Sequence, residues 1–421
     1  MRVIAPTLTL LCMFASSLFA QSASEQNTMP VLFTQKLVLR EASEVGLEIE
    51  ARAPGASWAR KGAEAPALVI AIDGERNQDL LLWAGDLLFT YRLLLGSLEA
   101  GEHTITIALN SARSAKNARR AQVAFARPLI FDRTHGEERL ALAHAPMLYA
   151  RANSIDRFTD VPLLLYYEVE RRPGGLLRLR YSAIFSNEDG GTPTAALMAR
   201  WGRATDIEWI YEVLLRDGQI VEESYQGVEH ETKPFTGKRA RGLHPLLAVA
   251  SDNNNFSDLA CSEVLFAPLP VRADLEHASR ESLMDANPWT YRIMAEELRR
   301  EGRIAETPAD INTIADPRDY LYVEAHATEK GEAVAIDVRL QGAESLFSSD
   351  AGNERLRVDR AGYFRVAVRL PKRFDPRRIV EVRARCGDRS VRNCKSDRVR
   401  ILKLTWLDES YQPHALDPPP Q

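Results

Sequence analysis

Short runs of alternating apolar and polar residues fill the chain between residues 37 and 131 and predict β-strands. Gly, Pro, Asn and Asp separate these runs, and one separator, residues 72–79 (IDGERNQD), is predicted to form a turn. Repeated short strands with such turns are typical of an immunoglobulin-like β-sandwich, which we place at residues 28–127. Its strands carry no cluster of surface aromatic residues, so we expect a spacer or packing module rather than an independent glycan-binding module.

The middle of the chain has further strand-like runs, with longer polar loops between them. They end in an amphipathic segment that predicts a helix. Asp285 or Asn287 suits its N-cap, and Gly302 suits its end. Pro288 fits the first turn of the same helix. We therefore assign residues 128–305 to a central β domain, a larger β-sandwich with a trailing α-helix.

Strand-like runs return towards the end of the chain. A polar, proline-containing segment at residues 306–316 is predicted to be a linker, and residues 317–408 are predicted to form a small C-terminal β-sandwich. Residues 409–421 are predicted to be a disordered tail. The whole pattern predicts a mainly β, multidomain protein.

The first residues are typical of a secretory signal peptide. Arg2 precedes an apolar run that ends at Phe19, and small or polar residues follow it. We assign residues 1–20 to the signal peptide, with Ser22 and Ala23 as alternative cleavage points. No later segment reaches about 18 uninterrupted apolar residues, so no transmembrane anchor is expected. The sequence therefore predicts an exported protein, periplasmic or secreted.

Export permits disulfides, and three cysteines follow the signal peptide. Cys386 and Cys394 flank a turn-rich segment between two alternating runs, so a hairpin would bring them together in a disulfide. Cys261 is left over. No activating base adjoins Cys261 in sequence, so we expect a buried, small apolar residue there.

Composition excludes several classes of protein. Hydrophobic residues make up 45% and charged residues 27%, as in an ordinary globular chain. The net charge of −4, without a basic groove interleaved with aromatic residues, argues against nucleic-acid recognition. The sequence has no nucleophile-elbow, Walker, dinucleotide-binding or H-E-x-x-H motif.

The central domain holds the polar residues that best suit a binding site. Asp206 and Glu208 are two apart on a predicted strand, so their carboxylates point to one face. Such neighbours repel, and both stay ionised only where a cation or arginines compensate them. Asp189 and His244 could complete the shell of a divalent cation, and this ligand set suits Ca²⁺, Mg²⁺ or Mn²⁺.

Other polar residues of the same domain could contact a ligand. Arg200 and Arg203 suit an anionic or sugar ligand, and His230 or Glu231 is the best candidate for a catalytic base. The full set of expected ligand-binding residues is Glu188, Arg200, Arg203, Asn253, Asn254 and Asn255. Each has a plain structural interpretation too, because a D-x-E pair marks the wet face of many strands and asparagines often cap turns.

The order of these elements resembles the Vps62-related family and, more remotely, the necrosis-inducing (NLP-type) secreted proteins. The resemblance rests on three segments, LRYSAIFSN, TDIEWIYEV and HPLLAVASDNNN. It implies a β-sandwich with a metal-bearing or anionic cleft at one end, with Asp206 and Glu208 on the family's acidic pair and His244 on its His-Pro residue. Thr205 stands near a position where the family often has histidine, Ile207 replaces its tryptophan, and asparagines replace a later histidine.

Three functions follow as hypotheses. The first is an exported binding protein whose central domain has a cleft for a divalent cation or a polar ligand, such as a glycan or another anionic surface ligand. The second is a metal-assisted hydrolase of glycans or phosphoesters. The third is a structural or assembly protein whose acids are paired with arginines. The first two require Asp189, Asp206, Glu208 and His244 to converge in one concave pocket, and the oligomeric state stays open.

Overall fold

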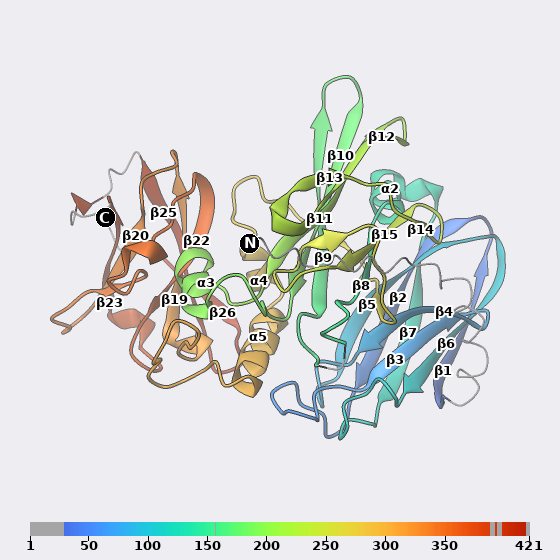
Figure 1. Cartoon of the computed structure of the whole chain (residues 1–421), viewed down its shortest axis with the longest axis horizontal. Coiled ribbons are helices and arrows are strands. Elements are labelled where there is room, and N and C mark those ends of the chain that lie inside the picture. The colour runs from blue at the N-terminus through green and yellow to red at the C-terminus, as the bar shows by residue number, and fades with distance from the viewer. Residues whose placement is uncertain (1–28, 156, 388–391, 394–397, 418–421) are drawn as a thin grey trace, which may run out of the picture.

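The chain folds into several β-sheets with few helices. The structure is a computed structural model that describes residues 29–155, 157–387, 392–393 and 398–417. It contains separate sheets arranged along the chain from the blue end to the red end of Figure 1, which confirms the predicted mainly β, multidomain fold. The predicted signal peptide, residues 1–20, lies outside the described residues.

Two antiparallel sheets form the N-terminal sandwich. Their strands are β1 (Val31–Leu39), β2 (Ser43–Arg52), β3 (Ala67–Ile72), β4 (Glu75–Leu81), β5 (Phe89–Leu98), β6 (Gly101–Asn110) and β7 (Gln122–Phe131). One sheet has the order β1-β6-β3-β4 and the other β5-β2-β7. Apolar side chains such as Leu47, Ile49, Leu68 and Ile107 are fully buried between them.

Strand β4 corrects the predicted turn over residues 72–79, of which only the β3–β4 connection at Asp73 and Gly74 is a turn. The strand was missed because its side chains are polar, yet Gln78 is fully buried. Its side-chain Nε2 donates to the Leu94 carbonyl at 2.7 Å, and its Oε1 accepts from Ala267 N of the central domain at 3.1 Å. These bonds satisfy a polar strand inside a domain interface.

The central domain has two sheets. Their strands are β8 (Met147–Tyr149), β9 (Pro162–Arg172), β10 (Leu176–Phe185), β11 (Ile207–Arg216), β12 (Gln219–Gln226), β13 (Thr232–Pro234), β14 (Arg239–Ala240), β15 (His244–Val249), β16 (Phe256–Ser257), β17 (Leu265–Phe266) and β18 (Val271–Arg272). The first sheet has the order β13-β12-β11-β10-β9-β18, and the second has the order β14-β15-β8-β17, with β16 beside β15. Tyr181, Phe185, Val213 and Leu247 lie in the core between them.

Helices connect the central domain to its neighbours. They are α2 (Gly136–Ala143), α3 (Thr194–Trp201), α4 (Ser282–Ala286) and α5 (Trp289–Arg300). The predicted helix is confirmed as α5, which is followed by Gly302 at φ +71°. Its predicted N-cap is wrong, because Pro288 takes that position, Asp285 lies inside α4 and Asn287 ends α4. Its residues Ile293 and Leu298 are fully buried in two different hydrophobic cores, so α5 joins the domains. Helix α3 was not predicted and lies against the C-terminal sandwich (Figure 1).

The C-terminal sandwich consists of two four-stranded sheets, β22-β19-β25-β26 and β21-β20-β23-β24. The strands are β19 (Tyr320–Ala327), β20 (Ala335–Leu340), β21 (Phe347–Ser348), β22 (Gly362–Arg369), β23 (Ile379–Cys386), β24 (Arg392–Asn393), β25 (Val399–Leu407) and β26 (Pro413–Leu416). The predicted disordered tail, residues 409–421, is wrong over β26, which pairs with β25, and Tyr411 before it is buried. Residues 306–316 likewise do more than link, because Ile314 is buried and pairs with Ile304.

The cysteine predictions meet the structure only in part. Cys386 ends β23, whereas Cys394 lies outside the described residues, so their disulfide stays a prediction. Cys261 is exposed, and its predicted burial is therefore wrong. It lies in the loop between β16 and β17, where its neighbour Leu259 is exposed as well.

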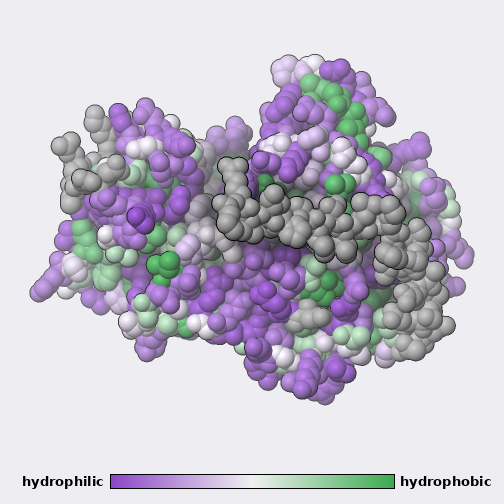
Figure 2. Space-filling view, viewed as in Figure 1, coloured by the Kyte–Doolittle hydropathy of each residue, from purple (hydrophilic) through white to green (hydrophobic). Residues whose placement is uncertain are grey.

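Hydrophilic side chains cover most of the face shown in Figure 2. Hydrophobic side chains gather in small areas of it, one of them at the top of the view on the protruding part of the central domain. No helix in the described part of the chain is both long and apolar enough to cross a bilayer.

Candidate functional site

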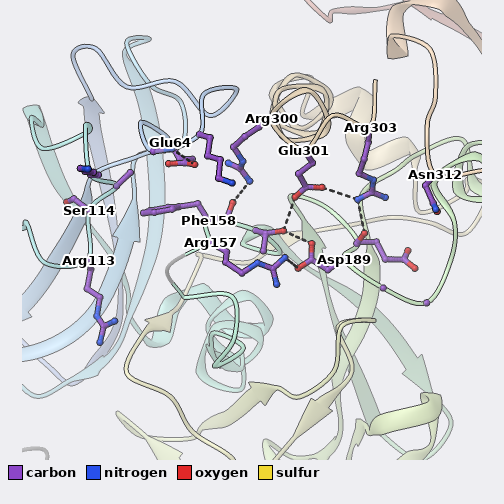
Figure 3. Close-up of a pocket in the computed structure, with 18 of the residues that line it drawn as sticks. Glu64, Arg113, Ser114, Arg157, Phe158, Asp189, Arg300, Glu301, Arg303 and Asn312 are labelled. Atoms are coloured by element: carbon purple, nitrogen blue, oxygen red, sulfur yellow. Dashed lines mark hydrogen bonds and ion pairs between the residues drawn. The ribbon is translucent and has the colours of Figure 1, made fainter. Parts of the chain in front are cut away.

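A cleft of about 1110 Å³ lies where the N-terminal sandwich meets the central domain and the end of α5. Figure 3 shows Glu64 and Ser114 on the side of the N-terminal sandwich, and Asp189, Glu301 and Arg303 on the opposite side. Small-molecule sites usually measure about 300–1,000 Å³, so this cleft is large enough for an extended ligand. It is the hollow that a binding function can use.

Two loops of the N-terminal sandwich form the first wall. Residues 53–66 connect β2 to β3, and residues 111–121 connect β6 to β7. The loops are held together because Ala115 N donates to the Ala65 carbonyl at 2.9 Å and Asn117 N donates to that of Gly62 at 2.8 Å. We call these loops the N-terminal wall.

Trp58 fastens the N-terminal wall to α5. Its fully buried indole donates to Glu297 Oε2 at 2.8 Å, and the Arg300 guanidinium lies 5.1 Å from the centre of its ring. Arg300 also donates to the carbonyls of Trp58 at 3.1 Å and of Phe158 at 2.7 Å (Figure 3). An arginine over an indole is a favourable cation–π pair, so this junction fixes one wall of the cleft relative to the other.

Asp189 is the main ionic centre of the opposite wall. Its carboxylate pairs with Arg151, pairs with Arg157 at 3.0 Å, and accepts the Thr159 hydroxyl at 2.7 Å. The Asp189 side chain is only 8% exposed, and Arg151 also pairs with Asp160 at 3.1 Å. Two arginines thus compensate Asp189, and they occupy the place that a divalent cation was predicted to take.

The loop around Asp189 is packed closely on a second loop. A Cβ atom at Gly190 would lie 2.7 Å from Asp252 Cβ, and one at Gly191 would lie 2.5 Å from Asn253 Oδ1. Gly191 also has φ +88°, a conformation that glycine adopts without strain. The two glycines of the predicted acidic loop therefore serve this close contact.

Glu301 and Arg303, just after α5, complete the opposite wall. Arg303 Nη1 lies 3.2 Å from Glu301 Oε2 and donates to Asn187 Oδ1 at 2.9 Å. Asn187 Nδ2 in turn donates to Glu301 at 2.9 Å. These bonds join the segment just after α5 to Asn187, which follows β10.

The cations of the two walls differ in how they are compensated. Arg157, Arg300 and Arg303 of the opposite wall each pair with a carboxylate, namely Asp189, Glu297 and Glu301. Lys61, Lys116 and Arg119 of the N-terminal wall are exposed, and no carboxylate among the described residues lies within ion-pair distance of them. We call these three residues the basic rim.

Behind the Asp189 loop the structure brings together Glu188, Asp206 and Glu208, which we call the acid cluster. Burial raises the pKa of Asp206 well above its usual value, and Glu208 and Glu188 raise it further, whereas Arg203 lowers it. Burial raises the pKa of Glu188 too, and Arg203 again lowers it. Arg203 lies 3.8 Å from Asp206, and Asn254 donates to Asp206 at 3.1 Å. Burial with few compensating charges therefore favours the protonated form of Asp206 and Glu188.

His230 lies beside the acid cluster, with Nδ1 at 3.8 Å from Glu208, within a group of amides. Gln226 Nε2 donates to Glu208 at 2.6 Å and lies 2.7 Å from His230 Nδ1. Asn253 and Asn255 approach the same ring at 2.9 and 3.3 Å. The imidazole is half-exposed, but it does not line the cleft.

Three predicted site residues lie elsewhere. His244 is fully buried between the Ala145 carbonyl and Glu44 of the N-terminal sandwich, at 2.9 and 3.1 Å. Glu231 is exposed beside Lys233, and Arg200 lies over the ring of its neighbour Trp201. The expected convergence of Asp189, Asp206, Glu208 and His244 in one pocket is therefore wrong, because His244 joins two domains and the cleft is lined by Asp189 without Asp206, Glu208 or His244.

Sequence reasoning missed the residues of the N-terminal wall, because that sandwich was interpreted as a spacer. A signal was present in the segment SARSAKNARR, residues 111–120, where a loop between two strands carries four basic residues in ten. Glu301 and Arg303 were missed because they follow a helix stop and belong to no motif.

No group of three or more His, Cys, Asp or Glu side chains within the described residues is arranged to hold a metal ion. The amide groups that face Asp206 and Glu208 donate hydrogen bonds, whereas a cation would need their oxygens. The divalent cation stays a prediction.

No protein-family model matches this chain, and no curated protein matches it. The resemblance to the Vps62-related family therefore stays a prediction, and the function is argued from the site alone.

Proposed function

We propose that this chain is an exported binding protein that holds an acidic ligand in the cleft between the N-terminal sandwich and the central domain. The observation that carries the proposal is the basic rim. Lys61, Lys116 and Arg119 face one hollow without carboxylate partners among the described residues, while the cations across the cleft are paired. Unpaired cations around a cleft attract anions and fix their position.

The size and lining of the cleft support a polar, extended ligand. Half of the residues that line the cleft are charged, and most of the others are small, such as Gly62, Ala115 and Gly190. Phe158 is the aromatic residue of the lining, but it is buried and lies edge-on to Trp58 at 6.3 Å. Export rests on the predicted signal peptide and agrees with a ligand outside the cytoplasm.

The test is calorimetric titration with two anionic probes, an oligogalacturonate and an inorganic polyphosphate, with neutral dextran as a third. We expect both anions to bind and dextran not to bind. Each exposed ion pair contributes about 0.2–1 kcal/mol. The triple variant Lys61→Gln, Lys116→Gln, Arg119→Gln should therefore bind both anions more weakly, by roughly 3-fold to 150-fold.

The matched control removes the same charge elsewhere. Three exposed cations lie outside the lining of the cleft and have no carboxylate partner among the described residues, namely Lys36, Arg40 and Arg216. Their triple glutamine variant should keep the wild-type affinity. The proposal fails if the wild type binds neither anion, or if the two triple variants lose affinity equally.

A further inference from the structure

Glu64 brings a negative charge into the N-terminal wall, beside the basic rim. It lines the cleft, is 5% exposed, and its Oε1 atom accepts the Gly62 N–H at 2.8 Å. Its Oε2 atom is buried and has no hydrogen-bond donor within the described residues. Buried carboxylate oxygens almost always have a donor, so an orphaned one in the wall of a cleft indicates that a donor is missing.

The side chains around Glu64 do not supply this donor. The hydroxyl of Ser114 donates its hydrogen to the Asn110 carbonyl at 2.7 Å, and it accepts the Ala67 N–H at 2.9 Å. Lys61 is three residues away in the same loop, but its ammonium is exposed and forms no ion pair with Glu64. The missing donor must therefore come from outside the wall.

The position of Glu64 restricts which anions suit the cleft. A ligand that satisfies both Glu64 and the basic rim must present acidic groups and, between them, a hydrogen-bond donor. Inorganic polyphosphate has no donor along its ionised chain, and Glu64 would repel it. A nucleic acid has donors, but its bases bind best to open aromatic faces, and Phe158 is buried and engaged with Trp58.

We propose, on the basis of the function proposed above, that the ligand is an acidic oligosaccharide and that Glu64 accepts a hydrogen bond from one of its hydroxyl groups. Sugar acids carry carboxylates and hydroxyls on the same ring, which matches a wall that places cations and one carboxylate side by side. A charge-assisted hydrogen bond to a carboxylate is roughly twice as strong as a neutral one, so Glu64 selects for such hydroxyls. The cleft, at about 1110 Å³, has room for more than one sugar ring.

The experiment compares the same two probes on Glu64→Ala and Glu64→Gln, with EDTA present so that bridging cations do not contribute. For Glu64→Ala we expect the affinity for oligogalacturonate to fall about tenfold, while the affinity for polyphosphate stays equal or rises. Glu64→Gln keeps an oxygen for the Gly62 N–H but places an amide N–H₂ where Oε2 was. It should weaken oligogalacturonate binding about threefold and strengthen polyphosphate binding.

Asp86 provides the matched control, because its Oδ1 atom accepts the Gly55 N–H of the same wall loop at 2.8 Å while the residue lies outside the cleft lining. Asp86→Ala should leave both affinities unchanged. If Glu64→Ala does not fold, which the melting temperature shows, Glu64→Gln decides alone.

The outcomes separate the two proposals. If the wild type binds neither anion, the function proposed above fails and Glu64 is not at issue. If it binds both, and the Glu64 variants change the two affinities in parallel or not at all, the oligosaccharide inference is overturned while the anion-binding cleft stands. Opposite changes for the two probes support the inference.

Discussion

The indole N–H of Trp58 in the N-terminal sandwich donates to Glu297 Oε2 on α5 at 2.8 Å, and neither side chain is exposed to solvent. This bond joins two segments that are far apart in sequence, at the base of the cleft. Burial raises the pKa of Glu297 to about 7, although Arg300 lowers it, so this carboxyl changes charge near neutral pH. The junction between the two walls therefore depends on pH.

We expect Glu297 to make the protein less stable as the pH rises from about 4.5 to about 7. Its pKa is higher in the folded chain than in the unfolded chain, so the folded state holds the proton more tightly over this range. The stabilisation from the protonated Glu297 carboxyl is fully present below its pKa in the unfolded chain. It is lost as the pH rises through its pKa in the folded chain, about 7. A shift of this size corresponds to on the order of 3 kcal/mol in the free energy of unfolding.

Glu297→Gln should remove this part of the pH dependence, because an amide does not titrate. Urea unfolding of the wild type and the variant at pH 5 and pH 8 measures it. The difference in the free energy of unfolding between the two pH values should shrink in the variant. An unchanged difference would show that Glu297 ionises normally in the folded chain.

Asp206→Asn should raise the free energy of unfolding, relative to the wild type, more at pH 8 than at pH 5. The raised pKa of Asp206 means that ionisation inside the acid cluster opposes folding as the pH rises above the ordinary aspartate range. Asn keeps an oxygen for the Asn254 amide, and Arg203 keeps its contact with Glu281 at 3.3 Å. An equal loss of stability at both pH values would show instead that the fold needs an ionised Asp206.

Divalent cations test the predicted ligand set directly. Because arginines and amide N–H groups already face Asp189, Asp206 and Glu208, we expect Ca²⁺, Mg²⁺ and Mn²⁺ at millimolar concentration to leave the melting temperature unchanged and to give no heat of binding. A rise in melting temperature that Asp206→Asn abolishes would contradict this and restore the cation shell.

The mainly β fold and α5 could be predicted from the sequence because both depend on local patterns of residues. Alternating residues give strands, and Pro288 with Gly302 marks the two ends of the helix. It failed at β4, where the buried Gln78 side chain is satisfied by one bond to β5 of the same sandwich and one to the central domain. The position of β26 was missed for a related reason, since its pairing with β25 is a tertiary contact.

For the candidate site, the sequence predicted which residues lie close together only where these residues are near neighbours in the chain. Glu208 lies on β11 and Asp206 directly precedes this strand, so the two stay close together, and the structure adds Glu188 to them. His244 was expected beside them because it belongs to the same polar part of the sequence. In the structure it lies on β15 and contacts Glu44 instead. The cleft itself needs loops from two domains, and no local pattern tells which loops will meet.

His244 is expected to support stability and not ligand binding. His244→Ala leaves Glu44 buried without its imidazole partner, which typically costs about 2–4 kcal/mol. His244→Gln can still donate towards Glu44 and should lose less. Urea midpoints measure both variants, and their affinity for oligogalacturonate should equal that of the wild type. A selective loss of binding with unchanged stability would place His244 in the site after all.

Asp189→Asn should change stability and anion binding in opposite directions. The substitution removes the charge that Arg151 and Arg157 share. Arg151 is nearly buried and keeps Asp160 at 3.1 Å and Asp252 at 2.8 Å, so we expect a moderate loss of about 1–3 kcal/mol in the free energy of unfolding.

Arg157 is exposed in the cleft lining, and without Asp189 its charge becomes available to a ligand. Oligogalacturonate and polyphosphate should both bind a few-fold more tightly, and this gain should fall as salt is added, because exposed charges are screened. Binding that weakens together with stability would mean instead that Asp189 shapes the cleft by holding its loop, and that the charge of Arg157 adds nothing to it.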